Sequence, residues 1–144
     1  MAGFLPDTSC MVAAVCTWHE HHIRTTAEIE RRLRQGERMV IAAPALVETY
    51  AVLTRLPSPH RLTTSAALAL LEANFIDAAE VIALDGKSYR TLLHQAPQED
   101  IAGGQTYDAV IAACAARANV ATLLTFNARH FMGAGAQGIR VCIP

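Results

Sequence analysis

The chain has 144 residues, of which 52% are apolar and 17% charged, and its formal net charge is −1. A chain of this length and composition can bury a core of its own, so we expect a single domain over residues 1–144. A protein that coats nucleic acid through phosphate contacts is normally basic, so this charge balance excludes that class. It is compatible with a nuclease whose acidic residues hold cations.

The cysteines and the N-terminal segment exclude further classes. Cys10, Cys16, Cys114 and Cys142 form no CxxC pair and have no histidine at zinc-finger spacing. We interpret them as buried thiols. The first residues lack the charged region and apolar core of a signal peptide, and no apolar run reaches the roughly 20 residues that span a bilayer. We therefore expect a cytoplasmic protein with no membrane segment.

Apolar and amphipathic stretches alternate from the N-terminus onward. Gly3–Pro6 is a short apolar run, and the Asp7-Thr8-Ser9 sequence after it can cap a helix over Cys10–Val15. Glu20–Gln35 has the pattern of an amphipathic helix, and Gly36 is suited to end it. This pattern predicts that Ile23, Ala27, Ile29 and Leu33 face inward and that Arg31, Arg32 and Arg34 face outward.

The same alternation continues to the C-terminus. Pro44 suits the first turn of a helix that runs to about Leu53, and Gly103-Gly104 marks a loop. Strands alternating with helices indicate a parallel sheet covered on both faces, in which ligands bind beyond the carboxyl ends of the strands. The other predicted elements are strands at Met39–Ala43, Glu80–Leu84, Ala121–Thr125 and Ile139–Ile143, helices at Thr63–Asn74, Lys87–Gln95 and Tyr107–Ala118, and a helical turn at Ala128–Phe131.

Three carboxylates and one amide fall where such a sheet would place a site. Asp7 directly follows the first predicted strand, and Glu48 lies one turn into the helix after the second. Asp108 opens the long helix before the fourth strand, and Asn127 follows that strand. If the first and fourth strands are neighbours, Asp7 and Asn127 emerge side by side. The sequence thus predicts an acidic cluster at one edge of the sheet.

Clustered carboxylates raise one another's pKa, so the cluster is unfavourable unless a cation occupies it. Oxygen-rich sites suit Mg²⁺ or Mn²⁺, which activate water and stabilise charge on a phosphodiester. Each acid also has a simpler interpretation: Asp7 as a helix cap, and Glu48 and Asp108 as first-turn acids that favour the helix dipole. Glu48 is the most informative, because its helix is otherwise largely apolar and an acid there needs a partner.

Four segments of the chain resemble PIN domains of the VapC toxin type. They are LPDTS, PALVETYAVLTRLP, GGQTYDAVIAACAARANVATLLTFNARHF and the closing strand, in the family's order and over nearly the whole chain. The resemblance implies a three-layer α/β/α fold around a parallel sheet of order 3-2-1-4-5. It also implies Mg²⁺- or Mn²⁺-dependent RNA cleavage, homodimers and a cognate antitoxin that covers the active site.

The resemblance also assigns roles to residues. Asp7, Glu48 and Asp108 would be metal ligands, and Ser9 and Thr125 would support them. Many family members carry an acid where this chain has Asn127, and many have Asp-Phe where it has His130-Phe131. Because an amide is a neutral ligand, this departure weakens the case for a second metal ion, although Asn127 stays in the expected catalytic set.

Several other residues have two interpretations. Arg55, Arg117, Arg129 and His130 are candidates for contacts with RNA, but each also fits a solvated helix end. The run Trp18-His19-Glu20-His21-His22 does not have the His-Glu-x-x-His spacing of zinc proteases, so we interpret it as a polar helix start. An apolar surface on Glu20–Gln35 and Thr63–Asn74 is the expected dimer contact.

Three other functions compete with the ribonuclease hypothesis. An inactive module that only binds RNA or protein predicts a broken acidic set, whereas three acids are present. A phospho-acceptor domain normally needs a lysine after a late strand, whereas the only lysine, Lys87, precedes a helix. A phosphatase or a nuclease directed at DNA would use the same metal chemistry, so sequence leaves that alternative open.

Overall fold

A five-stranded parallel sheet forms the centre of the molecule in the computed structural model, which describes residues 2–144. The strand order β3-β2-β1-β4-β5 confirms the expected topology, and every neighbouring pair is parallel. The strands are β1 (Gly3–Pro6), β2 (Arg38–Ala42), β3 (Glu80–Ile82), β4 (Thr122–Leu124) and β5 (Arg140–Cys142).

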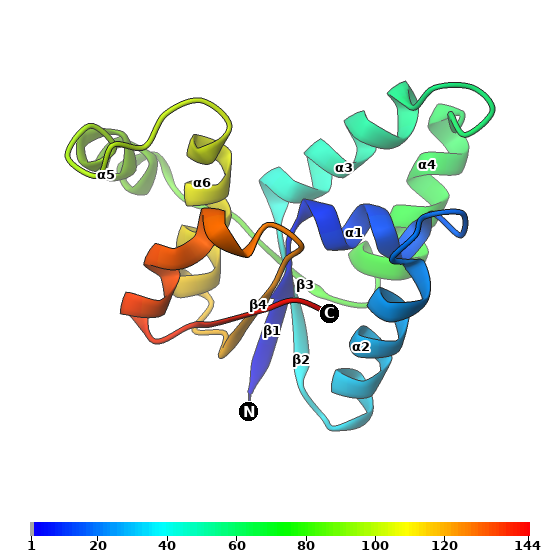
Figure 1. The fold of residues 1–144 in the computed structure, drawn as a ribbon, viewed down its shortest axis with the longest axis horizontal. Helices are drawn as coiled ribbons and strands as arrows, with labels where there is room; N and C mark the ends of the chain where they lie inside the picture. The colour runs from blue at the N-terminus through cyan, green and yellow to red at the C-terminus, as the bar shows by residue number, and fades with distance from the viewer. Residues whose placement is uncertain (1) are drawn as a thin grey trace.

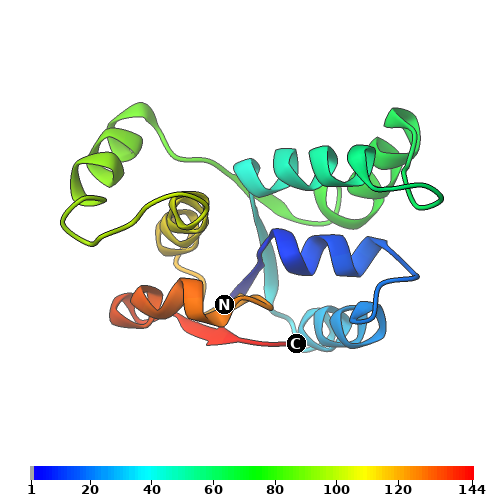
Figure 2. The same cartoon turned by 45° about the horizontal axis from the view of Figure 1, so that its top comes forward.

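Helices cover both faces of this sheet, as the sequence predicted. Helices α1 to α4 lie on one side, and α5, α6 and the 3-10 helix η2 lie on the other (Figures 1 and 2). The helices are α1 (Thr8–Val15), α2 (His22–Arg34), α3 (Ala43–Arg55), α4 (Thr64–Leu71), the π-helix η1 (Glu72–Ile76), α5 (Gly86–Gln95), α6 (Gln105–Arg117) and η2 (Ala128–Gln137). No helix among the described residues is long and apolar enough to cross a membrane.

The central strands are buried because parallel strands are covered on both faces. All four residues of β1 and all three of β4 are buried, and Phe4, Leu5, Leu123 and Leu124 are fully enclosed. In the β1–β4 register, Pro6 pairs with Leu124, so both strands end at the same level. The residues that follow them, Asp7 and Thr125, therefore emerge side by side.

The expected orientation of α2 is wrong in part. Ile29 is buried, but Ile23 is 80% exposed, Leu33 is 42% exposed and Ala27 is also exposed. Arg32, expected outside, is buried, because its guanidinium donates to the carboxylates of Glu28 at 2.7 Å and Glu37 at 3.0 Å. A buried charge is tolerated when it is paired in this way.

Most predicted elements differ from the structure by one or two residues at their ends, and two differ in helix type or by several residues. The single helix expected over Thr63–Asn74 is α4 followed by the π-helix η1, which ends at Ile76. The helical turn expected at Ala128–Phe131 is the start of a longer 3-10 segment that runs to Gln137. The interpretation of the cysteines as buried thiols is confirmed for Cys10, Cys16 and Cys114, whereas Cys142 is a free thiol that is only partly buried.

Candidate functional site

Asp7 is held in place by hydrogen bonds from both sides of the β1–β4 pair. It caps α1, where its Oδ1 accepts from the Cys10 backbone N–H at 3.1 Å and from the Ser9 hydroxyl at 2.6 Å. Its Oδ2 accepts from the Thr125 hydroxyl at 2.5 Å. The side chain is only 3% exposed. The capping role expected from the sequence is therefore present, and the same carboxylate is also fixed at the sheet edge.

The two hydroxyls that bind Asp7 also order the chain that follows β4. The Ser9 hydroxyl accepts from the Phe126 N–H at 3.1 Å, and the Thr125 hydroxyl accepts from the Asn127 N–H at 2.9 Å. Each hydroxyl thus donates to the carboxylate and accepts from the backbone. The network couples the position of Asn127 to that of Asp7.

Glu48, Asp108 and Asn127 line the same cavity as Asp7, with a volume of about 460 Å³. Glu48 comes from α3, the helix that follows β2, and Asp108 lies in the first turn of α6. Both are partly buried. The topology therefore brings the four residues to one cavity beyond the carboxyl ends of the strands, where parallel sheets bind ligands.

The electrostatics of this cavity disfavour the charged carboxylates. Burial raises the pKa of Asp7, and the hydrogen bonds from Ser9, Thr125 and Cys10 only partly oppose that effect. Burial also raises the pKa of Asp108, against the lowering effect of His130. The negative charge of Asp108 also raises the pKa of Asp7, and that of Glu48 also raises the pKa of Asp108. A cation in the cavity would offset both effects.

The donor set fits a hydrated hard cation better than an enclosed one. Within residues 2–144, no three histidine, cysteine or carboxylate side chains stand close enough together to surround a metal ion. Both oxygens of Asp7 already accept hydrogen bonds from protein donors. Mg²⁺ usually keeps several waters and binds through one or two carboxylates together with substrate phosphates. Asp7, Glu48 and Asp108 suit that kind of site.

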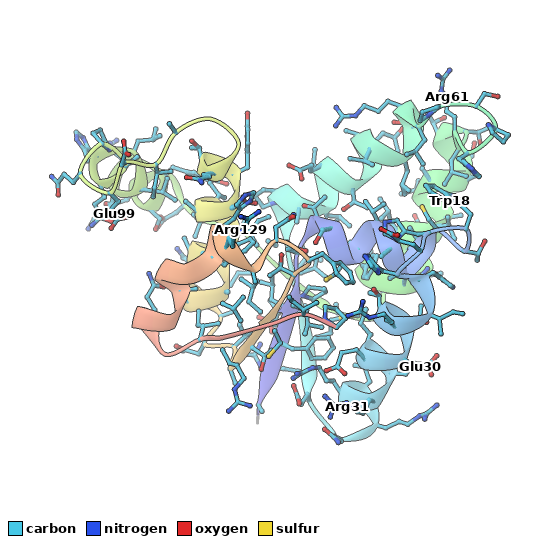
Figure 3. All side chains as sticks on the ribbon, in the orientation of Figure 1. Trp18, Glu30, Arg31, Arg61, Glu99 and Arg129 are labelled. Atoms are coloured by element: carbon cyan, nitrogen blue, oxygen red, sulfur yellow. The ribbon has the colours of Figure 1, made fainter. Side chains whose placement is uncertain are left out.

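The four residues suggested for RNA contacts lie at different distances from the cavity. His130 pairs with Asp108, with His130 Nδ1 2.9 Å from Asp108 Oδ2. Arg129, next to it at the start of η2, is exposed (Figure 3). Arg55 is exposed in the last turn of α3. Arg117 lies in the last turn of α6, at the opposite end from Asp108, and its guanidinium is 3.7 Å from Asp85.

One wall of the cavity was not expected from the sequence. His19, Glu20 and His21, in the loop between α1 and α2, line it together with Phe126. The interpretation of this run as a polar helix start holds only for its end, since α2 begins at His22. The sequence signal was the concentration of histidines itself. Their position next to Asp7 depends on α2 returning along the sheet, which no local pattern specifies.

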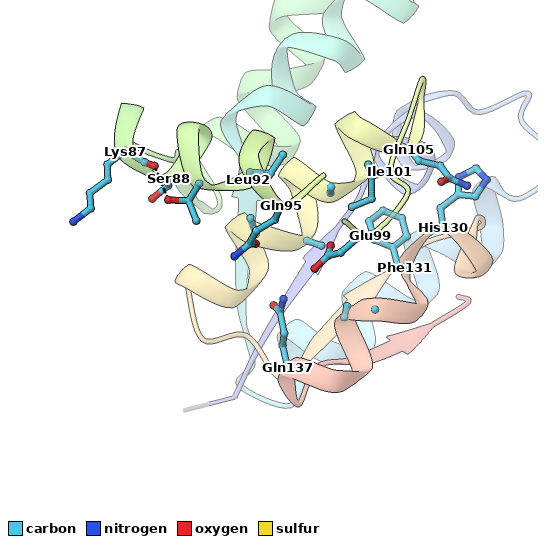
Figure 4. A pocket seen from close by; sticks show the side chains of 16 residues that line it. Lys87, Ser88, Leu92, Gln95, Glu99, Ile101, Gln105, His130, Phe131 and Gln137 are labelled. Atoms are coloured by element: carbon cyan, nitrogen blue, oxygen red, sulfur yellow. Dashed lines mark hydrogen bonds between the residues drawn. The ribbon is translucent and has the colours of Figure 1, made fainter. Parts of the chain in front are cut away.

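A second and larger cavity, of about 710 Å³, lies between α5, α6 and η2 (Figure 4). Lys87, Ser88 and Gln95 from α5 line one side of it, and Gln137 lies across from them. His130 borders this cavity as well as pairing with Asp108. Among the described residues that line it, Glu99 is the only acid, so this cavity lacks the several carboxylates that line the smaller one.

Sequence comparisons give a consistent family. The sequence-family model of the PIN domain matches residues 4–133 of this chain. Ribonuclease VapC40 of Mycobacterium tuberculosis is 44% identical over 124 residues, which is 86% of each chain. Ribonuclease VapC27 of the same organism is 35% identical over 118 residues, which is 81% of this chain and 80% of the relative.

Solved structures share the fold. VapC20 of Mycobacterium tuberculosis, described as a toxin that cleaves the sarcin-ricin loop, matches with a TM-score of 0.68 and 16% identity, over 95% of this chain and 96% of its own. The DNA-bound VapBC complex of Salmonella typhimurium matches with a TM-score of 0.68 and 25% identity, over 99% of this chain and 98% of that chain.

Proposed function

Because the chain belongs to the PIN-domain family and, within it, to the VapC ribonucleases, we propose that its acidic cavity hydrolyses RNA with the help of Mg²⁺ or Mn²⁺. The observation that carries the proposal is the convergence of Asp7, Glu48, Asp108 and Asn127 on one cavity. In that position the three carboxylates would hold a hydrated cation, in part through its waters. When bound, the cation supplies positive charge beside the scissile phosphate and lowers the pKa of the attacking water.

The protein's own groups have separate roles in this proposal. Ser9 and Thr125 hold the Asp7 carboxylate in one orientation, so that its position is set before the substrate binds. Asn127 is tied to the same network through its backbone N–H. Its side-chain amide would orient the attacking water or the phosphate, because an amide offers both a donor and an acceptor. His130, with Nδ1 2.9 Å from Asp108 Oδ2, would hold the Asp108 carboxylate in place.

Cleavage of a total RNA pool tests the proposal, with the cut sites mapped by end sequencing. We expect wild type to cleave in Mg²⁺ or Mn²⁺ and not in EDTA, and Asp108→Asn to lose most of the activity in the same buffer. The matched control is Asp77→Asn, an exposed aspartate outside the cavity, which should cleave like wild type. Equal cleavage by Asp108→Asn and Asp77→Asn would contradict the proposed site.

The alternative functions fit the structure less well. A phospho-acceptor mechanism needs a lysine near Asp7, but Lys87 lines the other cavity, on α5. An inactive binding module would not need a buried carboxylate with three hydrogen-bond donors around it. Hydrolysis of another phosphodiester would use the same groups, and the RNA cleavage experiment separates it from ribonuclease activity.

The chain acts as the toxin of a toxin–antitoxin pair, and a cognate antitoxin is its protein partner, as in the VapBC complexes that share its fold. We also propose a homodimer in the cytoplasm. In support of the dimer, Ile23 and Leu33 on α2 and Leu68 on α4 expose large apolar side chains on the two helices predicted to carry the contact.

A further inference from the structure

Five aromatic side chains form a continuous row beside the acidic cavity, here called the aromatic row: His60, Trp18, His19, His21 and Phe126. Trp18 stacks on His60 with ring centroids 4.1 Å apart, and His21 stacks on Phe126 at 4.4 Å. His19 joins the two stacks, with its ring centroid 5.9 Å from that of Trp18 and 5.6 Å from that of His21. Three separate loops supply the five rings, so the row is a tertiary feature.

The row leads from the carboxylates to the surface. At one end, His19, His21 and Phe126 line the cavity that also holds Asp7 and Asp108. At the other end, His60 is exposed and Trp18 is 47% exposed. Trp18 lies on the same side of the molecule as Arg61, the residue after His60 (Figure 3). A large ring left half open to solvent, next to a reactive cavity, is typical of a binding surface.

Hydrogen bonds hold the loop that carries the central part of the row. The His21 backbone N–H donates to His19 Nδ1 at 3.0 Å, so the neutral His19 ring carries its proton on Nε2. Burial and the neighbouring His21 lower the pKa of His19, which favours this neutral form. His22 Nδ1 lies 2.9 Å from the Ala13 carbonyl and anchors the start of α2. The rings are therefore positioned before any ligand arrives.

Cationic groups stand at both ends of the row. The Arg24 guanidinium lies over the Phe126 ring, 5.8 Å from its centroid. Arg61 is exposed, and its Nε donates to the Leu56 carbonyl at 2.9 Å. The one carboxylate in the α1–α2 loop, Glu20, lies 3.4 Å from His21 Nε2. Planar rings flanked by guanidinium groups match a chain of unpaired bases joined by phosphates.

We propose that the aromatic row binds single-stranded RNA on one side of the scissile phosphate. Unpaired bases stack on the open faces of Trp18 and His60, and the His19 Nε2–H donates to the nucleotide that enters the cavity. Base-paired RNA hides its base faces, so the row favours single strands and loops over duplexes. This inference rests on the RNA-hydrolysing function proposed above, and its test has a readout that needs no cleavage.

Trp18 is the only tryptophan of the chain, so its fluorescence reports directly on stacking at the row. The probe is a 2′-O-methyl RNA single strand of about ten nucleotides, a length that exceeds the cavity and reaches the row. It is added in EDTA, which prevents cleavage by removing the divalent cation. We expect saturable quenching of Trp18 by the single strand and none by a duplex of the same sequence at the same concentration.

Cleavage kinetics supply the second readout. Trp18→Ala and His60→Ala should each lower kcat/KM for the long single strand by about tenfold, the loss expected for one stacked base. Both variants should cleave a trinucleotide at the wild-type rate, because it fills only the cavity. Trp18→Phe keeps an aromatic ring and should retain most of the kcat/KM that Trp18→Ala loses. The matched controls are Leu93→Ala and His94→Ala, which replace exposed side chains on α5. These variants should cleave both substrates with the wild-type kcat/KM.

The outcomes distinguish failure of the aromatic-row proposal from failure of the proposed RNA hydrolysis. Quenching by single strands with no cleavage by wild type would support the row and refute RNA hydrolysis. Normal cleavage without quenching, or an unchanged kcat/KM in Trp18→Ala on the long strand, would overturn the row. If Trp18→Ala instead weakens only antitoxin binding, the row is a protein-docking surface and the proposal is wrong.

Discussion

Thr125→Val removes one hydroxyl from the site while nearly preserving the side chain's shape. That hydroxyl donates to Asp7 Oδ2 at 2.5 Å and accepts from the Asn127 N–H at 2.9 Å, in a fully buried position. A hydrogen bond to a charged group contributes about 1.5–3 kcal/mol, and an unsatisfied buried group costs about 1–3 kcal/mol. Asp7 keeps its bonds from Ser9 and Cys10, so we expect the free energy of unfolding to fall by about 2–3 kcal/mol where Asp7 is ionised.

The cost of this substitution should depend on pH. Burial raises the pKa of Asp7, and the Thr125 hydrogen bond lowers it, so its pKa in the valine variant should lie higher still. A carboxyl whose pKa is raised by folding contributes stability at low pH that is lost as pH rises through its folded-state pKa. The variant should therefore lose most stability where Asp7 is ionised, and the loss should shrink as pH falls and Asp7 becomes protonated.

Urea unfolding in EDTA, in acid and at a pH where Asp7 is ionised, measures both effects. Thr125→Ser keeps the hydroxyl and should cost only about 1 kcal/mol for the lost methyl group. Thr49→Val is a matched buried control, because the Thr49 hydroxyl donates to the helical carbonyl of Ala45 and should cost less than about 1 kcal/mol. If Thr125→Val costs no more than Thr49→Val, or if its cost is the same at both pH values, the reasoning fails.

Three further predictions concern the metal, Asn127 and the assembly. Mg²⁺ or Mn²⁺ should raise the Tm, by the equivalent of about 2.7 kcal/mol at a hundredfold excess over Kd. Asp7→Asn and Asp108→Asn should remove most of that rise in thermal-shift measurements, and a rise that survives both would refute the ligand assignment. Asn127→Asp should slow cleavage, because it loses an amide donor and repels the phosphate; a rate above wild type at saturating Mg²⁺ would instead identify position 127 as a weakened metal ligand. Light scattering at tens of micromolar should give the mass of a dimer, and a monomer would rule that assembly out.

The sheet was predictable because its central strands are short apolar runs that end at polar residues. Phe4 and Leu5 precede Asp7, and Leu123 and Leu124 precede Thr125, so the strands and their ends can both be read from the sequence. The order of the strands came from the family resemblance. The proximity of Asp7 and Asn127 followed from that order, because they come after the neighbouring strands β1 and β4 and parallel strands end at one edge.

Sequence reasoning fell short where tertiary contacts determine whether a residue is buried or which residues meet. Arg32 forms an i,i+4 pair with Glu28 within α2, but its guanidinium also donates to Glu37, which lies beyond the end of the helix and which helical periodicity does not describe. The suggestion that Arg117 contacts RNA stays a prediction; α6 carries this residue to the end opposite Asp108, which its residue type alone does not indicate. The aromatic row was missed for the same reason, since His60 and Phe126 meet the α1–α2 loop only in the folded chain.

The central claim is that the carboxylates hold a cation and water attacks the phosphorus, without help from the RNA's own 2′-hydroxyl. The most direct test is cleavage of an RNA in which the nucleotide at the cut carries 2′-deoxyribose, in Mg²⁺ or Mn²⁺, with the product ends identified by mass spectrometry. We expect this substrate to be cut by wild type and spared by Asp108→Asn, with the products ending in a phosphate and a hydroxyl. Loss of cleavage on removing the 2′-hydroxyl, together with a cyclic phosphate on the products of ordinary RNA, would contradict the account.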